Sequence, residues 1–254
     1  METGNWPGYN ELAWIEPIIA PPEDFAADTE DKCRLIRQHS RIEPQTLLHL
    51  GSGAGMNDYT FKKHFRVTGV DISDGMLEMA RQLNPEAVYY RGDMRTVALG
   101  KQFDVVVCME AIGYMLTVED TRRALSKAYE HLKPGGVFLF TTLLKDDFRE
   151  NNFAYSGARG DVEVTVFENN YLPDPEGTTY EATLVYLIRR RGELEIHTER
   201  HFLSLFKLET WAGLLRECNF AFTGSKETES YNSYLLGEGS YPVQVFTCVK
   251  PGAD

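Results

Sequence analysis

The sequence has few cysteines, and their spacing fits neither a metal site nor a disulfide framework. They stand at Cys33, Cys108, Cys218 and Cys248 in a chain of 254 residues, and no two of them form a CxxC pair. Zinc sites and disulfide-rich secreted folds use paired or closely spaced cysteines. A clear set of Asp and Asn ligands is also missing, so the sequence predicts no bound metal and a reducing, cytoplasmic location.

Long apolar runs are missing as well. No stretch approaches the length of about 18 apolar residues that a membrane-spanning helix needs. The first ten residues, "METGNWPGYN", hold no basic region followed by an apolar run, as a signal peptide would. We therefore expect no signal peptide, no membrane span and no membrane partner.

Basic residues are outnumbered by acidic ones. The chain has 26 Lys and Arg against 38 Asp and Glu, a formal net charge of -12. Phosphate backbones repel an acidic protein, so we expect no nucleic-acid partner. The one short basic patch, Arg189 to Arg191 before Gly192, is typical of an exposed turn between strands.

What the sequence does have is an alternation of strands and helices up to residue 145. Short apolar runs predict strands, and amphipathic stretches between them predict helices, the last of which stops at "KPGG". Such alternation predicts an α/β fold, with a parallel sheet covered by helices on both faces. The strands are predicted at 46–50, 66–73, 87–90, 103–109 and 137–144, and the helices at 55–65, 74–84 and 119–132.

After residue 145 the period changes. "DVEVTVFENNYL" and "TTYEATLVYLIRRRGELEIHTERHFLSLF" alternate apolar and polar residues, which predicts an antiparallel β meander. A helix at 208–219 and strands near 220–226 and at 243–249 then return to the main sheet. The predicted division is an N-terminal helical cap (1–45), a Rossmann-like cofactor-binding core (46–145), an inserted substrate-covering sheet (146–206), and the last helix and strands of the core (207–254).

The glycine-rich turn in "LLHLGSGAGM" follows the first core strand. Gly51, Gly53 and Gly55 allow positive φ and close approach of the backbone to a ligand, and a helix N-terminus follows. Asp71, 20 residues after Gly51, ends the second strand, where an acid accepts hydrogen bonds from ribose hydroxyls. The pattern predicts a nucleotide-type cofactor, either a nicotinamide dinucleotide or S-adenosylmethionine.

The end of the third strand favours S-adenosylmethionine. Asp93 and Met94 in "YYRGDMRTVAL" provide an acid for an adenine amino group and an apolar cover for the ring. The dehydrogenase motif GxGxxG has glycine at its sixth position, whereas this chain has Met56 there. A nicotinamide-dependent oxidoreductase stays open as the alternative, as does a catalytically silent S-adenosylmethionine-binding subunit.

Several of these segments together resemble the class I S-adenosylmethionine-dependent methyltransferases. They are "LLHLGSGAGM", "VTGVDISDGMLEMAR", "RGDMRTVALGKQFDVVVCMEAIGYM" and "LKPGGVFLF". The resemblance implies a seven-stranded Rossmann-like methyltransferase sheet with an inserted antiparallel β meander. A narrower resemblance links residues 92–116 and "ERHFLSLF" to the N,N-dimethyltransferases of nucleotide-linked amino sugars.

The resemblance also implies roles for individual residues. The three glycines line the methionine part of the cofactor, Asp71 holds its ribose, and the N-terminal segment closes over it. The implied cofactor-binding residues are Gly51, Gly53, Gly55, Asp71, Ile72, Met76, Asp93, Met94 and Met109, and the implied lid residues are Tyr9 and Trp14. Core packing is the other interpretation of each methionine.

The sequence departs from the family pattern in two places. His49 replaces the acid of "LLDVACGTG", where it either bonds loop amides or a water, or is a core histidine; we favour a structural role. Tyr114 in "AIGYM" replaces the histidine of "SIGHL" that is implicated as the base in the amino-sugar enzymes. A tyrosine, with a usual pKa of about 10, is a poor base at neutral pH but can orient an amine.

Methyl transfer to a nitrogen or oxygen of a small-molecule acceptor is the predicted reaction. Most of the rate is expected from holding nucleophile, methyl and sulfur in line, and a base is needed only for a protonated nucleophile. Candidate catalytic residues are Glu110 and Tyr114 after the fourth strand and His201 in the insertion, with His197 on the same strand face. The acceptor itself, and the choice between monomer and homodimer, stay open.

Overall fold

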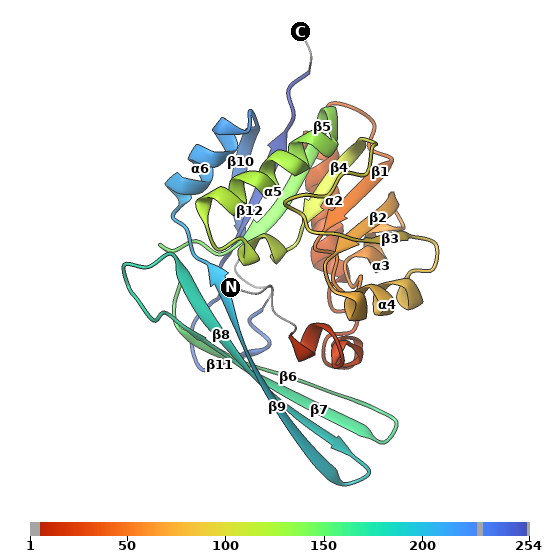
Figure 1. Ribbon diagram of the computed structural model, residues 1–254, viewed down its shortest axis with the longest axis vertical. Coiled ribbons are helices and arrows are strands. Elements are labelled where there is room, and N and C mark those ends of the chain that lie inside the picture. Colours follow the sequence, from red (N-terminus) through yellow and green to blue (C-terminus); the bar gives the residue numbers. More distant parts are fainter. Residues whose placement is uncertain (1–5, 228–230, 253–254) are drawn as a thin grey trace.

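Two sheets make up the structure, one for the core and one for the insertion (Figure 1). The computed structural model describes residues 6–227 and 231–252, so residues 1–5, 228–230 and 253–254 of the predicted terminal segments lie outside it. The core sheet has the order β10-β12-β5-β4-β1-β2-β3, and only β12 runs antiparallel to its neighbours. This confirms the predicted seven-stranded sheet. Its strands are β1 (Thr46–Leu50), β2 (Arg66–Asp71), β3 (Val88–Arg91), β4 (Phe103–Cys108), β5 (Leu132–Thr142), β10 (Ala221–Glu227) and β12 (Val243–Val249).

Helices cover both faces of this sheet, as predicted. Alternate residues of β1 point to opposite sides: Leu48 packs in one cluster with Trp211 of α6, and Leu47 packs in another with Ile36 of α2. α5 lies beside α6 on the first face, α3 beside α2 on the second, and α4 packs against β2 and β3. The helices are α2 (Ala26–His39), α3 (Asp58–Phe61), α4 (Asp74–Leu83), α5 (Val118–His131) and α6 (Leu208–Glu217).

The inserted sheet is antiparallel, with the order β11-β6-β7-β8-β9. Its long strands follow one another in sequence, which confirms the predicted meander. Two strands escaped prediction: β6, whose residues show little apolar alternation, and β11, which pairs Leu235 with Phe153 from a distant part of the chain. The strands are β6 (Asn151–Arg159), β7 (Val162–Tyr171), β8 (Thr179–Arg190), β9 (Glu193–Ser204) and β11 (Leu235–Leu236).

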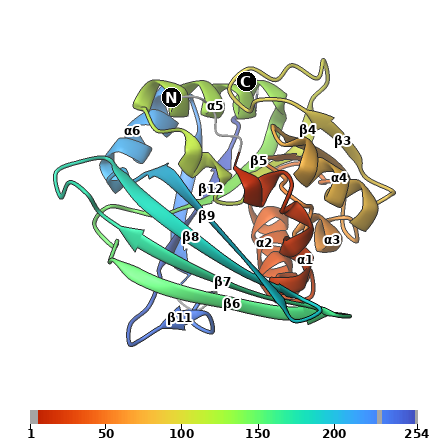
Figure 2. The same ribbon diagram turned by 60° about the horizontal axis from the view of Figure 1, so that its bottom comes forward.

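The segment of residues 6–15, here called the strap, joins the core to the inserted sheet (Figure 2). It contains the short helices η1 (Pro7–Tyr9) and η2 (Ala13–Ile15), and α1 (Glu16–Ile19) follows. On the core side, the Ser73 hydroxyl at the N-cap of α4 donates to the Tyr9 carbonyl. On the other side, the Gly8 amide donates to Glu199 of β9 at 3.0 Å. The strap therefore contacts both sheets within a few residues.

Two local predictions differ from the structure. The helix expected over 55–65 is α-helical only in α3, four residues long. The segment "KPGG" does follow the end of α5 but lies inside β5, which starts at Leu132 rather than at Val137. The pairing of β4 with β5 shifts register there, and the Gly135 amide bonds the Lys250 carbonyl at 2.8 Å, so this segment is a bulge held by the C-terminal strand.

None of the helices in residues 6–227 and 231–252 combines the length and apolar character that crossing a bilayer requires. The longest of them, α2 and α5, have 14 residues each and carry charged side chains.

Candidate active site

The glycine turn lies at the carboxyl ends of β1 and β2, the edge where α/β sheets bind ligands. Gly51 and Gly53 have φ angles of +67° and +53°, which disfavour other residues. A Cβ added to Gly51 would lie 2.3 Å from the Ala111 Cβ, whereas one added to Gly53 meets no protein atom within 4 Å. Packing against Ala111 therefore explains Gly51, and only Gly53 leaves its backbone open to a ligand.

Asp71 organises this turn. One carboxylate oxygen accepts from the Gly53 amide at 2.8 Å and the other from the Ser73 amide at 2.9 Å. Burial raises the pKa of Asp71, and these backbone bonds oppose the rise. A carboxylate has about four acceptor positions, so two remain for ligand hydroxyls.

The apolar residues expected around the cofactor lie at different depths. Ile72 is 46% exposed after the end of β2, and Met94 lies close to Gly51. Met76 is buried in a cluster with Ala54 and Met56, which Tyr9 covers. Met109 is partly buried against the core below the end of β4. Of these residues, Ile72 presents the most surface to a ring.

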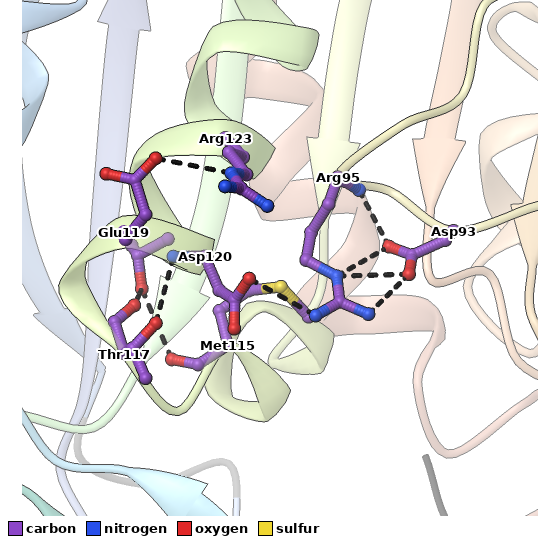
Figure 3. A network of polar contacts seen from close by, with 8 residues as sticks. Asp93, Arg95, Met115, Thr117, Glu119, Asp120 and Arg123 are labelled. Atoms are coloured by element: carbon purple, nitrogen blue, oxygen red, sulfur yellow. Dashed lines mark hydrogen bonds and ion pairs between the residues drawn. The ribbon is translucent and has the colours of Figure 1, made fainter. Parts of the chain in front are cut away.

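Asp93 is held by a neighbouring arginine (Figure 3). The Asp93 carboxylate accepts from the Arg95 backbone amide at 2.8 Å and from its guanidinium at 2.6 and 3.0 Å, and Arg95 also pairs with Asp120 at 3.2 Å. These bonds fill the usual acceptor capacity of a carboxylate. An adenine amino group at Asp93 would therefore have to replace one of them.

Glu110 begins the short helix η3 (Ala111–Tyr114) in a left-handed conformation, with φ of 58°. Such strain in a residue other than glycine is concentrated at functional sites. Tyr231 donates a hydrogen bond to the Glu110 carboxylate, and burial raises the pKa of Glu110 to about 7. Glu110 also lines a cavity of about 20 Å³ between the core and the inserted sheet. A sugar is far larger than this cavity, so side chains or the strap must shift to admit one.

A second partly buried carboxylate, Glu168 on β7, was missed by sequence reasoning. It accepts from the Asn170 amide at 2.9 Å and the Tyr155 hydroxyl at 3.1 Å, and burial raises its pKa. Its charge in turn raises the pKa values of Glu110 and of Tyr180, which lines the cavity. The signal was its place in "VEVTVFENN", where it shares the alternation of buried residues rather than of exposed ones.

Tyr114 and His201, predicted from distant parts of the sequence, lie together. The Tyr9 and Tyr114 hydroxyls are 2.6 Å apart, and the Tyr114 hydroxyl lies 2.8 Å from His201 Nδ1. His201 Nε2 lies 2.9 Å from Glu199 Oε1 in a bent contact that owes more to charge than to hydrogen bonding. We call Tyr9, Tyr114, His201 and Glu199 the Tyr9–Glu199 network.

Two other aromatic candidates stand apart from this network. Trp14 packs on the inserted sheet in the cluster of Leu12 and Ile188, with the Arg190 guanidinium 5.4 Å from its ring. The residue beside His201 is instead Trp6, whose ring stacks on the imidazole at 4.5 Å. His197 lies on the same face of β9 as His201 but is partly exposed, and its Nε2 lies 3.6 Å from Glu195.

His49 has a partner that the sequence did not reveal. Its Nδ1 lies 2.7 Å from Asp58 Oδ1, and both side chains are almost completely buried. The Tyr89 hydroxyl donates to the other Asp58 oxygen at 2.9 Å. Asn84 links the Tyr89 hydroxyl to the Gly55 carbonyl. His49 thus supports the glycine turn from below.

These residues suit the predicted cofactor. The open backbone at Gly53, the remaining acceptor positions of Asp71 and the exposed face of Ile72 suit an adenosine-type ligand. Among residues 6–227 and 231–252, no three His, Cys, Asp or Glu side chains are grouped as metal ligands.

Comparison with known proteins agrees with this assignment. The family described as "Methyltransferase domain" matches residues 47–136. The chain is 31% identical over 202 residues to a dTDP-4-amino-2,3,4,6-tetradeoxy-D-glucose N,N-dimethyltransferase of Saccharopolyspora spinosa, covering 76% of this chain and 78% of that protein. It is also 31% identical over 195 residues to a dTDP-3-amino-3,6-dideoxy-alpha-D-glucopyranose N,N-dimethyltransferase of Streptomyces fradiae, covering 74% of each.

Solved structures share the fold over nearly the whole chain. DesVI of Streptomyces venezuelae superposes with a TM-score of 0.79 at 24% identity, covering 95% of this chain and 96% of that one. CalS10, an amino pentose methyltransferase from Micromonospora echinaspora solved with S-adenosylmethionine bound, gives 0.72 at 21% identity, covering 89% and 91%. The likeness therefore includes the inserted sheet as well as the core.

Proposed function

The chain belongs to the class I S-adenosylmethionine-dependent methyltransferases, and from that premise we propose that it methylates the amino group of a nucleotide-linked amino sugar. It is an enzyme that methylates small molecules, with S-adenosylmethionine as cofactor. When bound, that cofactor supplies a methyl group on a positively charged sulfur, so the residues of this chain must hold the acceptor in line and manage its proton.

The observation that carries the proposal is a pair of partly buried carboxylates, Glu110 after β4 and Glu168 on β7, which lie close enough for the charge of Glu168 to raise the pKa of Glu110. Each raises the pKa of Tyr180, and their hydrogen-bond partners are neutral groups, namely the hydroxyls of Tyr231 and Tyr155 and the amide of Asn170. Two carboxylates in one site favour a cationic ligand, since a positive charge relieves both burial and mutual repulsion. An amino sugar brings an ammonium group at neutral pH.

The same two carboxylates disfavour an acidic acceptor. The chain is 30% identical over 135 residues to a malonyl-[acyl-carrier protein] O-methyltransferase of Serratia marcescens, covering 53% of this chain. A malonyl group carries a carboxylate, which would add a third negative charge beside Glu110 and Glu168. Like charges at close range in a buried site are strongly unfavourable.

For the cofactor, we propose the roles that the family resemblance implies. Gly53 offers its open backbone to the methionine part, with Gly51 and Gly55 shaping the turn, and Asp71 accepts from the ribose hydroxyls. Ile72 and Met94 contact the adenine, and Asp93 reaches its amino group by giving up a bond from Arg95. Tyr9 closes the site from the strap, while Met76 and Met109 shape its floor.

The acceptor is tested by offering three acceptors to the purified enzyme. They are a thymidine-diphosphate amino sugar, the same sugar with a hydroxyl in place of the amine, and malonyl-acyl-carrier protein. We expect S-adenosylhomocysteine release and a product heavier by one or two methyl groups with the amine alone. Turnover of either other acceptor without turnover of the amine rejects the proposal.

Replacing Asp71 with alanine should weaken cofactor binding without unfolding the protein. The lost charge-assisted hydrogen bonds are worth roughly 1–3 kcal/mol in S-adenosylhomocysteine affinity, measured by calorimetry. Asp74→Ala is the matched control, because Asp74 is exposed three residues away and forms an ion pair with Arg91, at 3.0 Å. Equal affinities for a folded Asp71→Ala and the wild type would remove Asp71 from the site.

A further inference from the structure

The Tyr9–Glu199 network draws its members from three separate parts of the chain. Tyr9 lies in the strap, Tyr114 ends η3 after β4, and His201 and Glu199 lie on β9 of the inserted sheet. His201 and Glu199 are buried, and Tyr9 and Tyr114 are partly buried. Three consecutive contacts of 2.6 to 2.9 Å connect them. Polar groups held this close in a protein interior interact more strongly than they would in water.

The contacts of Glu199 determine which nitrogen of His201 carries the proton. The Gly8 amide and the Tyr186 hydroxyl donate to its two oxygens at 3.0 and 2.5 Å. Burial raises the pKa of Glu199, but its contacts with His201, Tyr186 and Gly8 outweigh burial and leave that pKa below its ordinary value. An ionised Glu199 favours the proton of His201 on Nε2. Nδ1 is then a free acceptor for the Tyr114 hydroxyl.

The network lies next to the cavity at η3. Gly113, the neighbour of Tyr114, lines the cavity with Glu110, and Leu203 of β9 lines it from the other side. Tyr9 covers the cluster of Ala54 and Met76 beneath the cofactor loop. Burial keeps the pKa of Tyr114 well above its ordinary value, so Tyr114 passes a proton on rather than storing the charge itself.

We propose that His201 is the proton acceptor for the acceptor amine, reached through the Tyr114 hydroxyl, and that Glu199 and Trp6 are positioning residues that stabilise the resulting imidazolium. The inference rests on the proposed function. It gives His201 on β9 the role of base that is implicated for the histidine of "SIGHL" in the amino-sugar enzymes, a position that Tyr114 occupies in this chain.

The proton balance is as follows. The ammonium gives a proton to Tyr114 Oη as Tyr114 gives its own proton to His201 Nδ1, and the amine is left with a free electron pair. That pair forms the new bond to the methyl carbon, and the electron pair of the broken bond stays on sulfur. The imidazolium is then held between the Glu199 carboxylate, 2.9 Å from Nε2, and the stacked ring of Trp6.

The test compares two acceptors with His201→Asn and Tyr114→Phe. One acceptor is the ammonium-bearing sugar, and the other is the matching hydroxylamino sugar, whose nitrogen is already neutral at pH 7. We expect each variant to lower kcat for the ammonium sugar about 100-fold, the scale of general-base catalysis, and to change kcat for the neutral sugar far less. Tyr114→His places the histidine of "SIGHL" at this position, and its kcat for the ammonium sugar should be close to that of the wild type rather than to that of Tyr114→Phe.

The control variant is His197→Asn, on the same strand but outside the network. It should match the wild type on both acceptors. A loss by His201→Asn that is equal on the two acceptors, or no loss on either, overturns the proposal. A wild type that methylates no amine rejects the proposed function first, and the proton role of His201 with it.

A second readout needs no turnover. Nitrogen NMR of the labelled histidines should place the His201 proton on Nε2 in the wild type, with Nδ1 accepting a hydrogen bond that Tyr114→Phe removes. The titratable groups around this ring are Glu199 on its own strand and Tyr114 and Tyr9 from the core side, and Glu168 on β7 interacts with it through charge. A proton on Nδ1 in the wild type would contradict the proposed direction of transfer.

Discussion

Replacing His49 with aspartate is expected to destabilise the protein by about 3–5 kcal/mol, although aspartate is the residue type that related sequences carry in "LLDVACGTG". The new carboxylate would face Asp58, which is fully buried and now lies 2.7 Å from the imidazole. Two unpaired carboxylates in a buried site repel each other, and no water reaches them to screen the charge. Urea denaturation at pH 7 measures the loss.

A compensating change tests this explanation. Asp58→Asn removes one of the two charges, so the double variant His49→Asp, Asp58→Asn should recover much of the stability lost by His49→Asp alone. The two effects must then be strongly non-additive, as expected for residues in direct contact. Wild-type stability of His49→Asp at pH 7 would mean that the pair with Asp58 contributes nothing to the fold.

The second large effect is a gain of stability at the expense of activity. Glu110→Gln should stabilise the protein at pH 8 by about 2–3 kcal/mol and leave its stability at pH 4.5 nearly unchanged. Burial raises the pKa of Glu110 from 4.5 to about 7, so the folded state binds the proton more tightly than the unfolded chain does. The folded state therefore loses stability as pH rises through that interval, and the penalty is complete above it.

Unfolding by urea at the two pH values checks this expectation. Glu238→Gln, at an exposed position, serves as the control and should show no such dependence on pH. The Glu110→Gln enzyme should also bind the amino sugar more weakly, because the cation loses one of its two carboxylates. A stability gain that is the same at pH 4.5 and pH 8 would contradict the assigned pKa.

The fold was predictable because its signals are local. The fully apolar "FDVVVC" of β4 indicated a strand covered on both faces, and the acid and glycine spacing around β1 and β2 indicated the ligand-binding edge. β6 gave no such signal, because Phe153 is its one buried residue and the strand depends on pairing with β7. When pairing with a neighbouring strand stabilises a β-strand, the strand's own sequence carries little signal for predicting it.

The site was predictable only in part, because its contacts cross long stretches of chain. Tyr114 and His201 are 87 residues apart, and Gly8 and Glu199 are 191 apart. Residue type and position predicted Tyr9, Tyr114 and His201 as separate site residues, but nothing in the sequence predicted that they contact one another. Glu199 was within reach of sequence reasoning, since it stands two residues before His201 and so shares its face of the strand.

The two-residue strand β11 limits how the inserted sheet can be exchanged between related proteins. It completes the edge of the inserted sheet from residues 235–236, far beyond the segment that supplies the other four strands. The inserted sheet is therefore encoded in two pieces, separated by a helix and a strand of the core. A chimaera that exchanges only residues 146–206 between relatives would pair β6 of one protein with β11 of the other. We therefore expect that an exchange of the inserted sheet must include residues 235–236 to preserve its edge.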